Sequence, residues 1–181
     1  MGNSGGRLAP MNAVLQPSLH FQDMPSPVGR LRLIATETAL VSIWFEQGRD
    51  AARGRGELLE RWLPVLERTQ AQLEEYFAAQ RRDFDLPLEP RGTDFQRRVW
   101  QRLQSIPYGE TTTYGALATE LGDAKASRAV GLANGSNPIP IVIPCHRVIG
   151  ADGSLTGFGG GLTIKQQLLD LECAHRQPRL F

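Results

Sequence analysis

The order of hydrophobic and polar positions divides the chain into a strand-rich part and a helix-rich part. Polar and apolar residues alternate over residues 30–35, and β-branched and aromatic residues fill positions 40–45, as is typical of strands. Residues 57–80 instead place apolar side chains three and four positions apart, which predicts a helix that Pro64 bends or divides. We therefore expect residues 19–88 to form an α/β domain in which a small sheet packs against a helix.

Residues 93–175 carry mainly helical patterns and follow a proline-containing linker. One helix is predicted to begin at a cap formed by Thr93 or Asp94 and to stop at the turn over residues 106–109. Another is predicted over residues 162–173. This part of the chain is expected to form a second, mainly α-helical domain.

Between these helices, residues 111–122 and 126–135 predict two short helices joined by a turn at Gly122, in the manner of a helix-turn-helix. The second of them has a packing face and a slim face, formed by Ala126, Ala129, Val130 and Ala133 and by Arg128, Gly131, Leu132 and Gly135. A helix with such a slim face can approach a nucleic-acid duplex closely, with Arg128 as its one long side chain. The same pattern fits a small-residue helix packed on its neighbour, so the pattern alone leaves both interpretations open.

Composition and charge fit a globular protein and add one hint about a partner. The 181 residues are 41% hydrophobic, with 20 basic and 19 acidic side chains, and no apolar run is long enough to cross a bilayer. Residues 1–90 hold 10 basic and 12 acidic side chains, whereas residues 91–181 hold 10 and 7. The basic excess of the second half permits a nucleic-acid partner without establishing one.

The two cysteines exclude a disulfide scaffold, and no histidines at suitable spacing complete a structural zinc site. We expect neither a metal nor a cofactor. The first residues lack the apolar core of a signal peptide, so a reduced, cytoplasmic location is expected. Residues 1–18, rich in Gly, Pro and Asn, are predicted to be a flexible extension, and residues 176–181 a tail.

The strongest chemical pattern is a thiol followed directly by an imidazole. An apolar run over residues 139–143, which predicts a buried strand, leads through Pro144 to Cys145 and His146. A nearby imidazole can take the thiol proton and leave the nucleophilic thiolate, and because adjacent side chains point apart we expect a water to bridge them. An inert buried cysteine beside a surface histidine is the alternative.

Two further features lie near this pair in the sequence. Glu172 shares the apolar face of the helix over residues 162–173. If it is buried there, its carboxylate needs a hydrogen-bond partner such as an imidazole. The alternative is a Glu172 at the rim of the core. Asn137 precedes a proline and can hydrogen-bond its own turn. The glycine-rich residues 153–161 let backbone approach a flat ligand or a phosphate, although they lack the context of a nucleotide-binding loop.

The segment from Pro144 to Val148, preceded by Asn134-Gly135-Ser136-Asn137-Pro138, resembles the sequence pattern of the O6-alkylguanine-DNA alkyltransferases, also called methylated-DNA–protein-cysteine methyltransferases. The resemblance is close over residues 93–173 and looser over residues 21–88. It implies a ribonuclease-H-like N-terminal domain and a winged-helix-like C-terminal domain. The implied activity is DNA repair by direct reversal, in which the protein inactivates itself after one transfer.

The resemblance also implies a role for individual residues. Cys145 would accept the methyl or alkyl group, and His146, oriented by Glu172, would remove the thiol proton. Asn137 would connect the second helix of the helix-turn-helix, which recognises the DNA, to the turn that carries Cys145. The alkylated guanine would be flipped out of the duplex into the protein, where it would contact Tyr114, Val148 and Gly159. Arg128 would replace the flipped base in the stack, and the DNA backbone would be held near Phe95, Tyr114, Gly115, Asp123 and Ala151.

The implied partner is double-stranded DNA that contains O6-alkylguanine, with O4-alkylthymine left open as a second substrate. A monomer without membrane contact is expected, and assembly along DNA is left open. Two alternatives from other classes remain at this point: a protein that binds alkylated DNA without repairing it, and a Cys-His hydrolase. A hydrolase would turn over repeatedly, whereas an alkyltransferase would stop at one equivalent.

Overall fold

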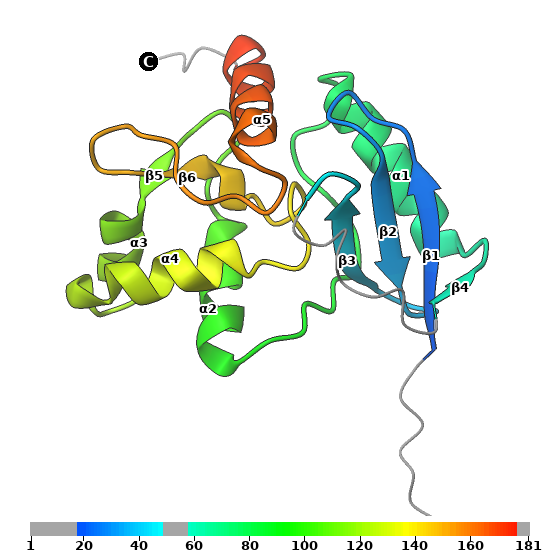
Figure 1. Cartoon of the computed structure of the whole chain (residues 1–181), viewed down its shortest axis with the longest axis horizontal. Coiled ribbons are helices and arrows are strands. Elements are labelled where there is room, and N and C mark those ends of the chain that lie inside the picture. The colour runs from blue at the N-terminus through cyan, green and yellow to red at the C-terminus, as the bar shows by residue number, and fades with distance from the viewer. Residues whose placement is uncertain (1–17, 49–57, 177–181) are drawn as a thin grey trace, which may run out of the picture.

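A computed structural model describes residues 18–48 and 58–176 of the chain, so the predicted extension and tail lie almost entirely outside the described residues. Within these ranges a sheet-and-helix domain precedes a mainly helical domain (Figure 1). The predicted fold class is confirmed.

The N-terminal domain is a four-stranded sheet with one helix packed on it. Its strands, in the spatial order β3-β2-β1-β4, are β1 (Leu19–Met24), β2 (Leu31–Ala35), β3 (Leu40–Phe45) and β4 (Leu58–Glu60). The first three strands pair antiparallel, and β4 pairs parallel with β1. Gly29 closes the turn between β1 and β2 at a φ of 96°, which favours glycine.

The helix of this domain, α1 (Pro64–Phe77), covers one face of the sheet (Figure 1). The prediction of a helix over residues 57–80 was wrong in its first part, since residues 58–60 form β4 instead. Pro64 begins α1 rather than bending it, because the first turn of a helix needs no N–H from that residue. Six side chains of α1 are buried against the sheet and the second domain, among them Leu66, Leu73 and Tyr76.

The C-terminal domain is built from four α-helices and short connecting elements. Their bounds are α2 (Asp94–Leu103), β5 (Thr112–Thr113), α3 (Tyr114–Glu120), α4 (Ser127–Gly135), β6 (Val148–Ile149) and α5 (Leu162–Ala174). Thr93 caps α2 in a capping box with Gln96, and Thr113 caps α3. The predicted helices are present, and the short parallel pair β5–β6 was missed.

The strand predicted over residues 139–143 is absent. This buried segment makes a tight turn instead, in which the Ile143 N–H donates to the Ile139 carbonyl at 2.9 Å and Ile141 has a φ of 74°. The β-branched residues suggested a strand, but Pro140 has no N–H to contribute to a sheet and the buried contacts impose the turn. Cys145 therefore begins a short 3-10 helix, η3 (Cys145–Arg147), rather than ending a strand.

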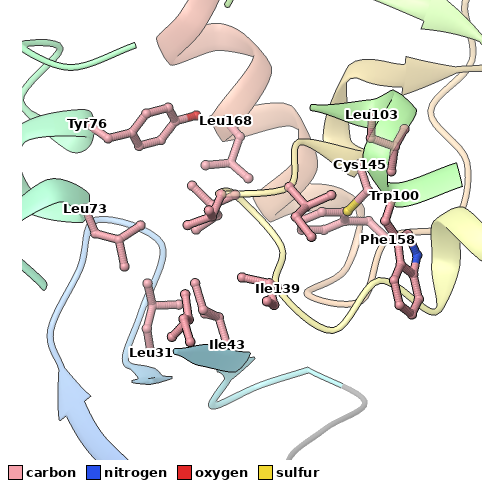
Figure 2. Close-up of a cluster of buried hydrophobic side chains, with 14 of the residues drawn as sticks. Leu31, Ile43, Leu73, Tyr76, Trp100, Leu103, Ile139, Cys145, Phe158 and Leu168 are labelled. Carbon is pink, nitrogen blue, oxygen red and sulfur yellow. The ribbon is translucent and has the colours of Figure 1, made fainter. Parts of the chain in front are cut away.

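The edge strand β3 joins the two domains. The Ile43 N–H and the Ser42 hydroxyl both donate to the Pro138 carbonyl, at 2.9 and 2.8 Å. On the same strand, Leu40 exchanges backbone hydrogen bonds with the linker at Pro87 and Glu89. Buried side chains from both domains form one hydrophobic core, shown in Figure 2. The N-terminal domain thus contacts the segment that leads to Cys145.

Candidate active site and nucleic-acid interface

Cys145 lies at the wall of a cavity of about 560 Å³ and is only 3% exposed. The cavity is bounded by α4, by the turn before Cys145, by the glycine-rich loop and by one side chain from the N-terminal domain. Its lining residues are Phe45, Tyr114, Ser127, Arg128, Gly131, Leu132, Asn134, Gly135, Ser136, Asn137, Pro140, Cys145, Thr156, Gly157 and Gly159. We call this space the Cys145 cavity; its volume is within the range of small-molecule sites.

The slim face predicted for α4 lines this cavity with all four of its residues. Arg128 and Leu132 are exposed there, and Leu132 is 74% exposed despite its apolar side chain. The opposite face packs into the core through Val130 and Ala133, as predicted. The prediction for Ala129 was wrong: it is exposed, and Asn134, one helical turn after Val130, is buried instead.

On the other side of Cys145, His146 and Glu172 lie together in the core. The imidazole Nε2 is 2.9 Å from Glu172 Oε1, and both side chains are completely buried. The helix α5 supplies Glu172 from its apolar face, and η3 supplies His146. The structure thus brings together the imidazole and carboxylate that the sequence singled out 26 positions apart.

Within the described residues, Glu172 accepts hydrogen bonds from His146 and from three further residues. The Arg147 guanidinium donates to both carboxylate oxygens at 2.9 Å, the Tyr76 hydroxyl donates to Oε1 at 2.8 Å, and the Gly109 N–H donates to Oε2 at 3.0 Å. We call Tyr76, Gly109, His146, Arg147 and Glu172 the Glu172 cluster. Burial alone would raise the pKa of the Glu172 carboxyl, but the hydrogen bonds from His146 and Arg147 and the charge of the Arg147 guanidinium outweigh it and hold that pKa well below its usual range.

The protonation states of Cys145 and His146 follow from their burial. Removal from solvent raises the pKa of the Cys145 thiol to about 11, although Asn137 and Lys165 oppose the shift. Removal from solvent also lowers the pKa of His146, against the pull of Glu172. At neutral pH the thiol is therefore protonated and the imidazole neutral. With Nε2–H donating to Glu172, the other ring nitrogen, Nδ1, is a proton acceptor, and it is buried without a hydrogen bond within the described residues.

Lys165 is a buried cation that was not among the residues predicted for the site. Its Nζ donates to the carbonyls of Val148 and Thr156, at 2.6 and 2.8 Å, and ties the glycine-rich loop to the strand that follows Cys145. Lys165 lies seven residues before Glu172 on the same helix, so the helical spacing that places Glu172 on the apolar face places Lys165 there too. Tyr76 gave no such signal, because its contact with Glu172 comes from the other domain.

Of the remaining residues predicted for the site, some line the Cys145 cavity and Val148 does not. Asn137 donates from Nδ2 to the Ile143 carbonyl at 2.8 Å and holds the turn before Cys145. The Tyr114 hydroxyl accepts a hydrogen bond from Thr156 at 3.0 Å, and Tyr114 and Gly159 both line the cavity. Val148 is completely buried and does not line the cavity; its carbonyl already accepts from Lys165.

Apart from Tyr114, which lines the Cys145 cavity, the residues expected at the DNA backbone lie outside that cavity. Phe95 is in the first turn of α2 and Gly115 in the first turn of α3, both partly exposed. Asp123 caps the short helix that precedes α4, and its side chain accepts from the Lys125 N–H. Ala151 is exposed in the turn after β6. Backbone N–H groups at such positions suit phosphate groups.

Within the described residues, no group of three or more His, Cys, Asp or Glu side chains is placed to hold a metal ion. No helix in the described ranges is long and apolar enough to cross a membrane.

The fold and site together define a two-domain protein that holds a buried cysteine beside a cavity lined by the second helix of a helix-turn-helix. Family models match both parts. Residues 19–90 match "6-O-methylguanine DNA methyltransferase, ribonuclease-like domain", and residues 94–174 match "6-O-methylguanine DNA methyltransferase, DNA binding domain". The chain belongs to the 6-O-methylguanine DNA methyltransferase family.

Individual relatives agree with this assignment over most of the chain. The methylated-DNA–protein-cysteine methyltransferase of Methanosarcina acetivorans is 46% identical over 85% of this chain and 98% of its own length. That of Mycolicibacterium paratuberculosis is 48% identical over 90% and 97%. The crystal structure of Mycobacterium tuberculosis OGT in complex with DNA matches with a TM-score of 0.80 and 44% identity, covering 86% of this chain and 94% of that one.

Proposed function

We propose that this chain repairs alkylated DNA by direct reversal, with Cys145 accepting the alkyl group from O6 of guanine once per molecule. The observation that carries the proposal is the position of Cys145. It lies between a cavity walled by the second helix of the helix-turn-helix and a buried imidazole hydrogen-bonded to a carboxylate. A base must leave the duplex to reach such a cavity, and Arg128 is the long side chain that can take its place in the stack.

The reaction is a displacement at the alkyl carbon. The thiol proton passes to Nδ1 of His146 through a water, since the pKa of Cys145 is too high for the free thiolate to be abundant at neutral pH. The sulfur forms a bond to the alkyl carbon while the bond from that carbon to O6 breaks. The guanine leaves with its electron pair, stabilised by the Tyr114 hydroxyl at N3 and by the Gly159 N–H at O6. The product is a thioether, which thiol exchange does not reverse.

The helix-turn-helix side of the protein would hold the duplex. The narrow girth of α4 suits the minor groove, because Arg128 and Leu132 are its only large side chains on the cavity face. Backbone N–H groups near Phe95, Gly115, Asp123 and Ala151 would hold phosphates on either side.

The partner is double-stranded DNA that contains O6-alkylguanine, and the unit that repairs it is a monomer. All the groups assigned to the reaction come from a single chain, so no second copy is needed to complete the site. Because the substrate is genomic DNA, we place the protein in the cytoplasm with access to the nucleoid.

The test is intact-mass spectrometry after incubation with a duplex that carries one O6-methylguanine, followed by peptide mapping. We expect a gain of one methylene on the peptide that contains Cys145, which saturates at one per protein. Bound lesion without a mass gain would contradict transfer and leave a lesion-binding protein. Repeated release of product would contradict the single-turnover scheme.

A further inference from the structure

The N-terminal domain contributes one polar atom to the Glu172 cluster. Tyr76, on α1, is completely buried, and its hydroxyl donates to Glu172 Oε1 at 2.8 Å across the domain boundary. Figure 2 shows this hydroxyl pointing from α1 toward α5, beside Leu168. In this arrangement, the oxygen that accepts from Tyr76 is also the one that accepts from His146 Nε2.

The aromatic surroundings of Tyr76 hold that hydroxyl in one direction. Its ring packs against Phe77, Phe84 and Tyr108, with ring centroids 5.4, 5.5 and 6.0 Å away. Rings packed on several sides cannot turn without opening the core. The domain interface thus determines where the hydroxyl hydrogen lies relative to Glu172.

The hydroxyl stays protonated, and therefore a donor, at neutral pH. Burial and the neighbouring Glu172 carboxylate raise the pKa of Tyr76 well above its usual value. A neutral donor on Oε1 takes up part of the negative charge that would otherwise attract a proton on His146. The bond therefore fixes the carboxylate and moderates its pull on the imidazole at the same time.

We propose that Tyr76 is a positioning residue of the alkyl transfer, through which the N-terminal domain holds Glu172 Oε1 and thereby controls proton acceptance by His146. This inference rests on the proposed roles of Cys145 and His146. It gives the N-terminal domain an indirect part in the chemistry, through the hydrogen bond from Tyr76 to Glu172.

Other titratable and charged groups face the same site. Arg147 comes from η3, Lys165 comes from α5 and also acts on His146, and Tyr108 follows α2, with the Arg82 guanidinium near its ring. Tyr108 offers a matched control. It is buried in the same aromatic group and contacts Tyr76, but its hydroxyl has no hydrogen-bond partner within the described residues.

The experiment compares the wild type with Tyr76→Phe and Tyr108→Phe in single-turnover methyl transfer from an O6-methylguanine duplex, as a function of pH. Loss of the Tyr76 donor strengthens the attraction of Glu172 for an imidazolium proton, so neutral His146 becomes populated only at higher pH. We expect the acid limb of the rate profile to move up by about half a pH unit in Tyr76→Phe, which is about a threefold slower transfer on that limb. Tyr108→Phe should retain the wild-type limb, and all three proteins should reach one methyl per chain.

A second measurement does not depend on transfer. The chain has three histidines, so nitrogen NMR can follow the His146 ring in each protein, and its titration should move to higher pH only in Tyr76→Phe. An unchanged acid limb and an unchanged His146 titration in Tyr76→Phe would overturn the inference. An equal shift in Tyr108→Phe would also overturn it. So would a Tyr76→Phe variant that loses rate equally at every pH and has a lower melting temperature. If the wild type itself gains no methyl, the proposed function fails, whereas normal wild-type transfer with an unshifted Tyr76→Phe profile overturns only the role of Tyr76.

Discussion

Cys145 lies between two environments of opposite character. In the Glu172 cluster on one side, charged and polar groups are buried and hydrogen-bonded to one another across η3, α5 and α1. In the Cys145 cavity on the other side, glycines and the slim face of α4 leave open space, and Arg128 and Leu132 are exposed. The difference indicates two separate roles. The closed side holds the proton acceptor His146 in a fixed geometry, and the open side can receive a large, flat partner.

The largest effect is expected at Cys145 itself, where the two sides meet. Cys145→Ala should abolish transfer, because it removes the proposed nucleophile, while lesion binding on the open side remains. Intact-mass spectrometry and a DNA-binding titration measure the two properties separately. Cys173→Ala, at the exposed cysteine on α5, is the matched control and should transfer normally. Any methyl gain by Cys145→Ala would contradict the assignment of the nucleophile.

The next largest effect is expected from Glu172→Gln, which removes the negative charge from the Glu172 cluster. The amide leaves the buried Arg147 guanidinium without its counter-charge, and loss of one partner of a buried ion pair costs about 3–5 kcal/mol of the free energy of unfolding. Transfer should also slow, because His146 loses its carboxylate. Chemical denaturation and single-turnover kinetics measure both effects. Asp170→Asn, the same change at an exposed position of α5, should alter neither.

The contribution of Glu172 to stability should depend on pH. The folded-state pKa of Glu172 lies well below its usual range, so its stabilising effect is present above the unfolded-state pKa, about 4.3, and is lost as the pH falls below that value. The difference in stability between the wild type and Glu172→Gln should therefore be largest near neutral pH and shrink in acid. A difference that grows in acid would contradict this sign.

On the open side, Arg128→Ala should weaken binding to a lesion duplex without changing the fold. We expect a loss of about 1–3 kcal/mol in binding free energy, since Arg128 is exposed and lines the cavity. The melting temperature and the mass of the transfer product should stay as in the wild type. Arg30→Ala removes the same charge from the N-terminal domain and serves as the control. Equal affinities for the two variants would remove Arg128 from the interface.

The smallest of these effects concerns the loop where the cavity meets the N-terminal domain. A Cβ at Gly160 would lie 2.9 Å from Cδ2 of the buried Phe45, whereas a Cβ at Gly157 would meet nothing within 4 Å. Gly160→Ala should therefore lower the free energy of unfolding by about 1–2 kcal/mol through overpacking. Gly157→Ala is the control in the same loop, and thermal denaturation compares the two. Equal melting temperatures would show that Phe45 yields to the added methyl group.

The sequence by itself determined much of the second domain and of its chemistry. The faces of the helices, the cap at Thr93 and the adjacency of Cys145 and His146 are local, since each depends on residues a few positions apart. The place of Glu172 on the apolar face of α5 left burial and the rim of the core both open, and the structure shows burial; the same spacing carried a signal for Lys165. Residues 58–60 and 139–143 were assigned to the wrong elements, because apolar and β-branched runs indicate burial without specifying the backbone path.

Only the tertiary structure decided which partners the buried groups have. Tyr76 and Glu172 are 96 positions apart, and on its own helix Tyr76 is one more apolar residue facing the core. Phe45 contacts the loop at Gly160 from an edge strand whose pattern says nothing about a second domain. The periodicity of a helix or strand indicates that a side chain is buried, but it does not specify which partner that side chain contacts. The partner depends on how the two domains pack. That packing brings the Tyr76 hydroxyl of one domain to the Glu172 carboxylate of the other.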